Sequence, residues 1–263
     1  MIQTMQALAF DSKVAFLTLL KKEIVRFRKV AFHTIAAPVI SSLLYLVVFS
    51  AAVGSRVTMP GSTDYLQFLV PGLVMMAVLQ NAFANVSSSF VQSKISGTLA
   101  FILMPPMTGG LIAGAYILSS VLRGLIVGAC VLIATALVAP VDVAHLGWIA
   151  VFAAIGSTVM ASLGLVAAIW ADRYEEMGVI QNFFIMPLTF LAGVFYSTES
   201  LPGIWQDIAR INPLFYLIDG FRGGFIGHFE SDPRVSLLVA VPFAAACVLF
   251  CAYLINKGYK IRS

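Results

Sequence analysis

Long stretches without charge dominate the pattern of this chain. Five of them contain no Asp, Glu, Lys or Arg, and they lie between Lys29 and Arg56, Asp64 and Lys94, Asp142 and Asp172, Glu176 and Glu199, and Arg234 and Lys257. Each is longer than the about 20 residues that a helix needs to cross a hydrocarbon core of about 30 Å. A sixth apolar region is interrupted only by Arg123. Because the runs are continuous rather than alternating, they predict membrane-spanning helices.

These six regions place the chain among all-α integral membrane proteins, with a single transmembrane domain over residues 1–263. Composition agrees, since 60% of the residues are hydrophobic and only 11% are charged, with a mean hydropathy of +0.96. Soluble domains are about half apolar and about a quarter charged. The predicted spans cover residues 33–54, 66–88, 111–139, 146–171, 178–196 and 235–256.

The distribution of Lys and Arg predicts the orientation, because cytoplasmic loops carry the excess of positive charge. With the N-terminus inside, eleven of the sixteen basic residues are cytoplasmic, four are outside and one lies in a span. Both termini are therefore expected inside, which an even number of spans requires. The inner set is Lys13, Lys21, Lys22, Arg26, Arg28, Lys29, Lys94, Arg173, Lys257, Lys260 and Arg262, and the outer set is Arg56, Arg210, Arg222 and Arg234.

Residues 10–32 predict a separate amphipathic helix that lies in the membrane interface. A basic side would meet the anionic lipids of the inner leaflet; a solvated charged helix is the alternative. This charged N-terminal segment and the late, long first apolar run do not fit a cleavable signal peptide. The apolar face is formed by Leu17, Leu20, Ile24 and Phe27, and the basic face by Lys22, Arg26 and Lys29.

The cytoplasmic loop over residues 91–110 is too apolar for an ordinary loop and too short for a further pair of spans. It predicts one short helix from Gln92 to Met104, ended by two prolines, with Ile95, Leu99 and Ile102 at helical spacing. Such a helix suits docking into a groove on a partner. A cytosolic extension of the neighbouring spans is the alternative.

The outer loop over residues 197–234 contains short apolar pieces broken by charged residues, and neither piece can cross a membrane. We expect half-helices that enter the outer leaflet and are buried against protein. Asp219 and Arg222 are three residues apart, so on a helix they share a face and can form a pair. A solvated loop is the alternative.

The sequence contains no recognisable catalytic centre. It has no phosphate-binding loop of the G-x-x-x-x-G-K-[ST] type, no H-E-x-x-H and no G-x-S-x-G, and its three histidines are scattered. Cys247 and Cys251 are one helical turn apart, but no His or carboxylate accompanies them, so we interpret them as small buried residues. No cofactor and no metal site are expected. The charge asymmetry accounts for the net charge of +4, so we expect contacts with membrane lipid and no nucleic acid.

The predicted spans also lack Asp and Glu, although ion-driven transporters generally need an intramembrane carboxylate or His. Arg123 either extends toward the inner headgroups or faces the protein interior, and we favour the first. Ser120, Gly124 and Gly128 form a stripe of small residues that permits close helix packing. Packing within the chain is the preferred interpretation of the stripe, and a dimer contact is the alternative.

With these residues in place, the chain resembles the permease subunits of the type-2 ABC exporter family, which includes drug, polysaccharide and Nod-factor exporters. The match covers roughly residues 10–255. In the cytoplasmic loop the family often has an Arg-Glu pair before the motif Gly-Thr and an acid after it, whereas this chain has Lys94, Ile95 and Ala100. The matching residues are Pro187, Gly193, Phe195, Leu201, Pro202, Asn212, Pro213, Tyr216 and Arg222 in and before the outer loop, and Gly97, Thr98 and Pro105 in the cytoplasmic loop.

The resemblance implies a permease that exports an amphipathic, lipid-linked or drug-like molecule across the bacterial cytoplasmic (inner) membrane. It implies two copies of this chain, two copies of a separate ABC ATPase subunit, and a substrate path between the permeases. ATP hydrolysis would then belong to the partner, and this chain would not be an enzyme. A secondary transporter or channel, or a membrane scaffold, remains an alternative. The implied coupling residues are Gln92, Lys94, Ile95, Gly97, Thr98, Leu99 and Ile102.

The orientation can be tested by thiol labelling in a background without the native cysteines. Ser62→Cys and Ser231→Cys should react with an impermeant reagent added outside sealed cells, because the Lys and Arg distribution places them outside. Ser96→Cys should not react until the cells are opened. Labelling of Ser96→Cys from outside would contradict the orientation.

Overall fold

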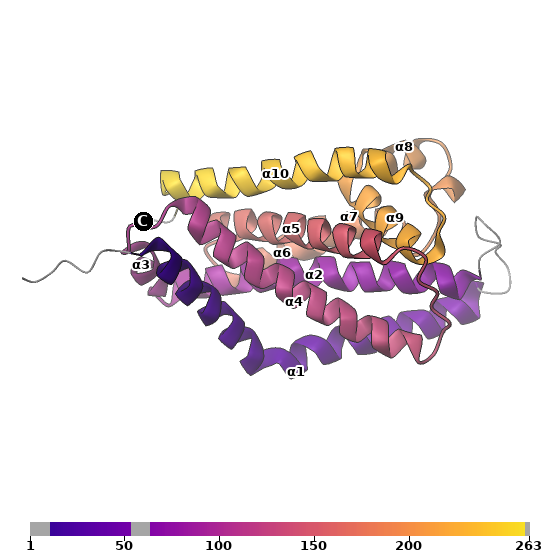
Figure 1. Ribbon diagram of the computed structural model, residues 1–263, viewed down its shortest axis with the longest axis horizontal. Coiled ribbons are helices and arrows are strands. Elements are labelled where there is room, and N and C mark those ends of the chain that lie inside the picture. Colours follow the sequence, from indigo (N-terminus) through magenta and orange to yellow (C-terminus); the bar gives the residue numbers. More distant parts are fainter. Residues whose placement is uncertain (1–10, 54–63, 261–263) are drawn as a thin grey trace, which may run out of the picture.

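The computed structural model describes residues 11–53 and 64–260, and within these ranges its regular structure is entirely helical. The predicted boundaries at Phe10 and Gly54 and the predicted outer residues Arg56 and Ser62 lie outside them. Figure 1 shows the long helices running side by side along the longest axis. In chain order the elements are α1 (Ser12–Val53), α2 (Tyr65–Ile95), α3 (Thr98–Leu103), α4 (Gly109–Ala136), α5 (Leu146–Trp170), α6 (Tyr174–Ile180), the π-helical turn η2 (Gln181–Ile185), α7 (Met186–Leu191), the 3₁₀ turn η3 (Thr198–Ser200), α8 (Ile204–Ile211), α9 (Pro213–Ile226) and α10 (Pro233–Lys257).

Five described helices, α1, α2, α4, α5 and α10, are long and apolar enough to cross a membrane. At the remaining predicted span, residues 178–196, the structure has α6, η2 and α7 in succession, and the helical run ends at Leu191. Pro187 lies in the first turn of α7. Because proline cannot donate the regular helical hydrogen bond, it favours a local change of helix geometry, and the π-helical turn stands directly before it. Six spans therefore stay a prediction.

The predicted interfacial helix and the first predicted span form one helix, α1, without a break between them. Figure 1 shows α1 bending along its length, and Pro38 lies inside it. Leu17 and Ile24 of the predicted apolar face lie on the surface of the chain, where lipid would contact them, while Glu23 is fully buried. The side of α1 that packs inward therefore combines apolar and polar residues.

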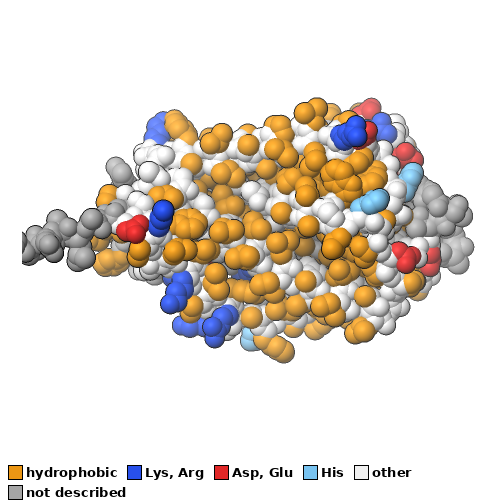
Figure 2. Space-filling model, in the orientation of Figure 1, with side chains coloured by type: hydrophobic (Ala, Val, Ile, Leu, Met, Phe, Trp, Pro, Cys, Tyr) orange, Lys and Arg blue, Asp and Glu red, His pale blue; other side chains and the backbone are white. Residues whose placement is uncertain are grey.

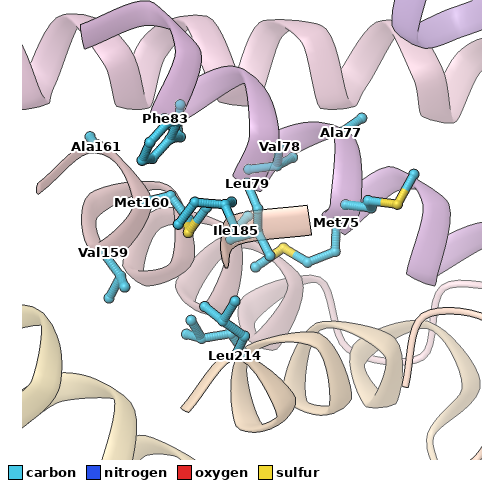
Figure 3. Close-up of a cluster of buried hydrophobic side chains, with 14 of the residues drawn as sticks. Met75, Ala77, Val78, Leu79, Phe83, Val159, Met160, Ala161, Ile185 and Leu214 are labelled. Carbon is cyan, nitrogen blue, oxygen red and sulfur yellow. The ribbon is translucent and has the colours of Figure 1, made fainter. Parts of the chain in front are cut away.

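The helix α2 lies at the centre of the bundle, where it packs against α1, α4, α5 and α9. Its residues are buried on nearly all sides, as expected for a helix that is apolar all round. Figure 3 shows Met75, Leu79 and Phe83 of α2 near Met160 of α5 and Leu214 of α9. On the face seen in Figure 2, hydrophobic side chains cover the middle, while most charged side chains lie toward the two ends.

Glycines on α4 and α5 bring these helices close to α2. A Cβ atom on Gly128 would overlap Val78, one on Gly124 would lie 3.0 Å from the Val78 carbonyl oxygen, and one on Gly164 would lie 2.7 Å from the Phe83 carbonyl oxygen. The predicted stripe on α4 thus faces α2 of the same chain. Small residues at such contacts allow the dispersion attraction that associates helices in lipid.

A large side chain in the stripe should separate α4 from α2. Gly128→Leu should lower the free energy of unfolding by about 1–3 kcal/mol, as overpacking does in well-packed cores. Thermal unfolding of the purified protein in neutral detergent measures the change. Gly147→Leu is the matched control, because nothing lies within 4 Å of a Cβ atom there. Equal stability of the two variants would contradict the close packing.

Candidate functional site

The segment between α2 and α4 is not one helix. α2 ends at Ile95, Gly97 has a left-handed backbone with φ of 71°, and α3 begins at Thr98. The predicted single helix over Gln92–Met104 is therefore wrong. Glycine at a left-handed position ends the first helix without steric cost and lets the second start in a new direction.

The apolar side chains of this segment divide into a buried set and an exposed set. Leu99 is 5% exposed and belongs to the core of the chain, and Ile102 packs against that core. These two predicted docking residues are therefore covered by the chain itself. Ile95, Phe101 and Met104 are 55%, 71% and 75% exposed. We call these three residues the coupling patch, after the role that the resemblance implies for this loop.

Lys94 ties the end of α2, next to the coupling patch, to the end of α5. Its Nζ donates hydrogen bonds to the carbonyl oxygens of Ile169 (3.1 Å) and Ala171 (2.7 Å) and to Asp172 Oδ1 (3.0 Å). The last carbonyls of a helix lack partners within it and favour a cation. The hydrogen bond from Lys94 and its positive charge lower the pKa of Asp172. Gln92, earlier on α2, is exposed.

The backbone after α7 is held by buried side chains from distant elements. Arg222 Nη2 on α9 donates to the carbonyl oxygens of Gly193 (2.5 Å) and Val194 (3.4 Å). The Tyr65 hydroxyl on α2 donates to the Phe195 carbonyl oxygen at 3.0 Å. Gly193 has φ of 80°, which glycine adopts readily. Two parts of the motif, residues 193–195 and the distant Arg222, therefore meet at one place.

The Asn-Pro pair of the motif begins α9. Asn212 Oδ1 accepts a hydrogen bond from the Leu214 amide at 3.0 Å, and Pro213 occupies the first turn, where its missing N–H costs nothing. Asn212 Nδ2 donates to the Leu188 carbonyl oxygen at 2.7 Å, so the cap also joins α9 to α7. Tyr216, on the following turn, is half-buried.

The Leu-Pro pair of the motif precedes the short helix α8. Leu201 is half-buried and Pro202 is exposed. On α8, Ile204, Trp205 and Ile211 are 70%, 53% and 81% exposed. A short amphipathic helix with an exposed apolar side suits a membrane interface, so entry of this region into the outer leaflet stays a prediction.

Asp219 and Arg222 are both buried, at 2% and 4% exposed, but the predicted pair between them is wrong. Asp219 Oδ1 and Oδ2 instead accept hydrogen bonds from the amides of Glu230 and Ser231, each at 3.0 Å. The Arg222 guanidinium lies 3.7 Å from the centroid of the Phe68 ring and binds carbonyl oxygens. Arg222 thus holds the loop after α7 against α9, and Asp219 holds the loop after α9 against the same helix.

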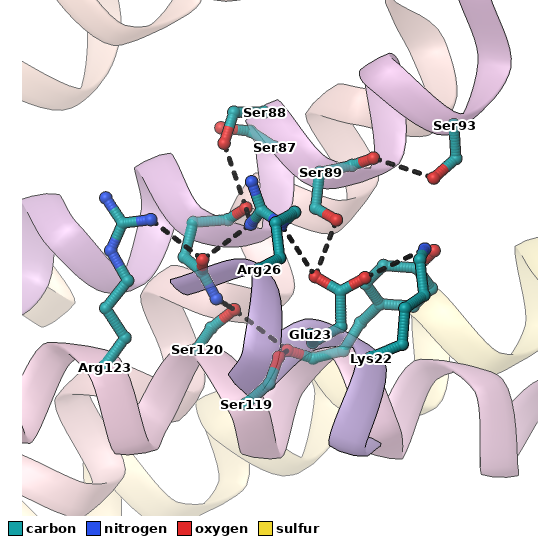
Figure 4. A network of polar contacts seen from close by, with 12 residues as sticks. Lys22, Glu23, Arg26, Ser87, Ser88, Ser89, Ser93, Ser119, Ser120 and Arg123 are labelled. Atoms are coloured by element: carbon teal, nitrogen blue, oxygen red, sulfur yellow. Dashed lines mark hydrogen bonds and ion pairs between the residues drawn. The ribbon is translucent and has the colours of Figure 1, made fainter. Parts of the chain in front are cut away.

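A second polar cluster joins α1, α2 and α4 inside the bundle. Arg26 Nη2 donates to the backbone carbonyl oxygen and to Oδ1 of Asn85, at 2.9 and 2.7 Å, and Arg123 Nη1 donates to the same Oδ1 at 2.9 Å. Glu23 Oε2 accepts from Ser89 at 2.6 Å and from Arg26 Nε at 3.2 Å. Figure 4 shows Glu23, Arg26 and Arg123 converging on α2 from α1 and α4. We call this group the Asn85 cluster.

The Asn85 cluster corrects two predictions from the sequence. The prediction that Arg26 lies on a lipid-facing basic side is wrong, because Arg26 binds within the protein. Arg123 was expected to extend toward headgroups, but it is 8% exposed and lies against the Phe27 ring. Ser120, from the stripe on α4, accepts a hydrogen bond from Asn85 Nδ2 at 2.9 Å. The stripe therefore ends in a polar contact at this cluster.

Glu23 is the buried residue that sequence reasoning missed. It is the one acid within α1, among several basic residues and three residues before Arg26. The polar run in α2, including Asn85 and Ser89, was the accompanying signal, because polar residues inside a span need partners.

No group of three metal-ligating side chains occurs in the part of the chain that the structure describes. Of the two neighbouring thiols, that of Cys251 donates a hydrogen bond to the Ser162 carbonyl oxygen at 3.2 Å.

These motif contacts lie within a region that matches a known family. Residues 14–226 match the family model described as ABC-2 type transporter. The chain belongs to this family. It is accordingly a multi-pass membrane protein with a transport role, and permeases of the ABC-2 family generally work with an ATPase subunit.

Similar proteins carry transport or nodulation names. The chain is 35% identical over 250 residues to "Inner membrane transport permease YadH" of Escherichia coli K12, covering 95% of this chain and 98% of that protein. It is 25% identical over 208 residues to "Nodulation protein J" of Rhizobium meliloti, covering 79% of each chain. Across nearly its whole length, this ABC-2 chain therefore resembles a transport permease of an inner membrane.

Because Asp219 and Arg222 bind different partners, we expect that the loss of stability caused by substituting one will not be offset by substituting the other. Arg222→Ala and Asp219→Ala should each lower the free energy of unfolding by about 1–3 kcal/mol, because each leaves buried backbone groups without partners. Combining them should give no recovery. Thermal unfolding of the single and double variants in detergent measures this.

Asp207 and Arg210 on α8 provide the control, because they have the same spacing and are both exposed. Their alanine variants should leave the unfolding temperature nearly unchanged. A double Asp219→Ala and Arg222→Ala variant more stable than either single variant would restore the idea of a direct pair.

Proposed function

We propose that this chain is the transmembrane permease subunit of an ABC exporter. Two copies would assemble with two copies of a separate ATPase subunit and export an amphipathic, lipid-linked or drug-like molecule across the bacterial inner membrane. Membership of the ABC-2 family supports the transport role. The relative named as an inner membrane transport permease supports the location.

The coupling patch is the observation that carries the proposal. Ile95, Phe101 and Met104 expose apolar surface in a segment that the Lys and Arg distribution predicts to be cytoplasmic. Exposed apolar side chains in a cytoplasmic segment are typical of protein contact sites. The bonds from Lys94 to the end of α5 hold this segment against the bundle, so a force applied to the patch would reach the spanning helices.

The proposed topology has six spans, with both termini inside. The run from α6 through α7 would form the fifth span, with the short helices α8 and α9 entering the outer leaflet. The exposed apolar residues Phe183 and Phe184 support contact of this run with lipid or with a second copy. The number of copies comes from the resemblance.

The alternative, an ion-driven transporter, would need a carboxylate that is free to bind the coupling ion. Two carboxylates are buried, and that of Asp219 is held by two backbone amides. At Glu23, Lys22 lies 3.1 Å from Oε1, and Arg26 and Ser89 bind Oε2. A carboxylate held by two cations is poorly suited to reversible ion binding. The exporter is therefore the better-supported function.

Charge in the coupling patch should weaken attachment of the ATPase. Phe101→Asp should reduce its affinity by roughly 2–3 kcal/mol, counting lost apolar burial and a desolvated charge. Co-purification of the ATPase with the tagged permease, and the ATP hydrolysis of the complex, measure the loss.

Val14→Asp, which replaces an exposed apolar residue of α1, is the matched control and should retain the ATPase. Leu99→Asp should instead lower the stability of the permease, because Leu99 is buried. Permease without ATPase supplies the baseline and should hydrolyse no ATP. Undiminished ATPase binding by Phe101→Asp would place the docking surface elsewhere.

A further inference from the structure

A pocket of about 370 Å³ lies between α1, α2, α4 and the run from η2 to α7. One part of its lining is polar, and another part is apolar, with Pro38, Tyr45, Met76 and Phe190. The lining therefore offers both kinds of surface that an amphipathic molecule needs. The polar lining residues include His33, Ser42, Gln80, Asn81, Arg123 and Gln181.

Arg123 lines this pocket without a carboxylate to balance its charge. Its side chain is 92% buried, being 8% exposed, and its Nε has no hydrogen-bond partner. Within the described residues, which include all twelve Asp and Glu of the chain, no carboxylate oxygen lies within 4.0 Å of it. Its hydrogen bond goes to the neutral amide of Asn85.

The rest of the Asn85 cluster does not balance the charge of Arg123. Its single carboxylate, Glu23, is accompanied by Arg26 and by Lys22, whose side chain is 40% exposed, so one buried positive charge is left over. Glu23 is already bound by the other two cations. Buried charge without a counter-ion is costly, so an anion in the pocket would be strongly favoured.

We infer that this pocket binds the anionic headgroup, a phosphate or a carboxylate, of an amphipathic molecule. Arg123 pairs with the headgroup, since a guanidinium donates two parallel hydrogen bonds to such anions. Gln80, whose Nε2 is also buried without a partner, provides a further donor. The apolar lining receives the first part of the hydrocarbon chain. Figure 4 shows one side of the Arg123 guanidinium directed to the cluster and the other directed away from it.

Two sources share this chemistry, a phospholipid of the bilayer and the exported molecule. Assigning the pocket to the exported molecule rests on the proposed function, whereas binding itself does not. The purified full chain in neutral maltoside micelles, without ATPase, therefore tests the binding site separately.

The probe is lysophosphatidic acid labelled with a fluorophore, and the matched neutral probe is the corresponding labelled monoacylglycerol. The wild-type chain should bind the anionic probe saturably and at least about tenfold more tightly than the neutral one. Arg123→Gln should remove at least about tenfold of that affinity, while Arg123→Lys should retain part of it. Arg28→Gln, which removes an exposed arginine of α1, should bind as the wild type does.

Ala37→Trp keeps the test informative if Arg123→Gln does not fold. Ala37 lines the pocket and takes no part in the Asn85 cluster, so a large side chain there should block the probe without removing a charge. Unchanged binding by Ala37→Trp, or by a folded Arg123→Gln, would overturn the proposal. Equal binding of the charged and neutral probes would overturn it as well.

The complex with ATPase, reconstituted in phosphatidylcholine vesicles, separates the two sources. Displacement of the probe by added phosphatidylglycerol would support a site for a bilayer lipid. Stimulation of ATP hydrolysis by the probe, lost in Arg123→Gln, would support a site for the exported molecule. If the chain binds the probe but never couples to an ATPase, the proposed function fails and the anion site stands.

Discussion

The structure depends on one constraint: inside a membrane, backbone carbonyls and buried charges find their partners within the protein, because lipid offers none. Regular helices provide hydrogen-bond partners for most backbone groups, and a few side chains bind the backbone groups that are left without partners where helices end. Arg222 binds the carbonyls after α7 and Asn212 caps α9, and in the segment predicted to be cytoplasmic Lys94 binds the carbonyls at the end of α5. Each of these side chains also connects elements far apart in the sequence, so satisfying the backbone and positioning the helices are accomplished by the same contacts.

This constraint explains which features could be predicted from the sequence. The long apolar runs predicted the helices α2, α4, α5 and α10, since a continuous rather than alternating apolar run is typical of a helix in lipid. Local turn chemistry was less visible. The predicted helix continued through Gly97, because the left-handed backbone that glycine adopts does not change the spacing of the hydrophobic residues around it. The merging of the N-terminal amphipathic helix into α1 was missed for a related reason, since a change of composition between Phe32 and His33 is not a change of backbone conformation.

Buried polar residues were the hardest to place. Side-chain spacing put Asp219 and Arg222 on one face, but spacing cannot show that loops after α7 and α9 offer each of them backbone partners. The same holds for Arg26 and Arg123, whose common partner Asn85 lies on a third helix. Partner choice over such sequence distances depends on the packing of α1, α2 and α4, which is set in part by the glycines that let α4 approach α2. Chemistry at these positions is therefore a tertiary property.

The π-helical turn Gln181–Ile185 has a consequence for how the run from α6 to α7 is aimed. Such a turn accommodates one residue more than a regular α-helical turn. Each residue of an α-helix rotates the chain by about 100° and advances it by only about 1.5 Å. Deleting one residue here would therefore leave the reach of the run almost unaltered while turning every side chain of α7 to a different direction. The number of residues in this turn therefore sets the rotation of α7 about its own axis. That rotation decides whether Met186 and Phe190 face the pocket or the surrounding membrane.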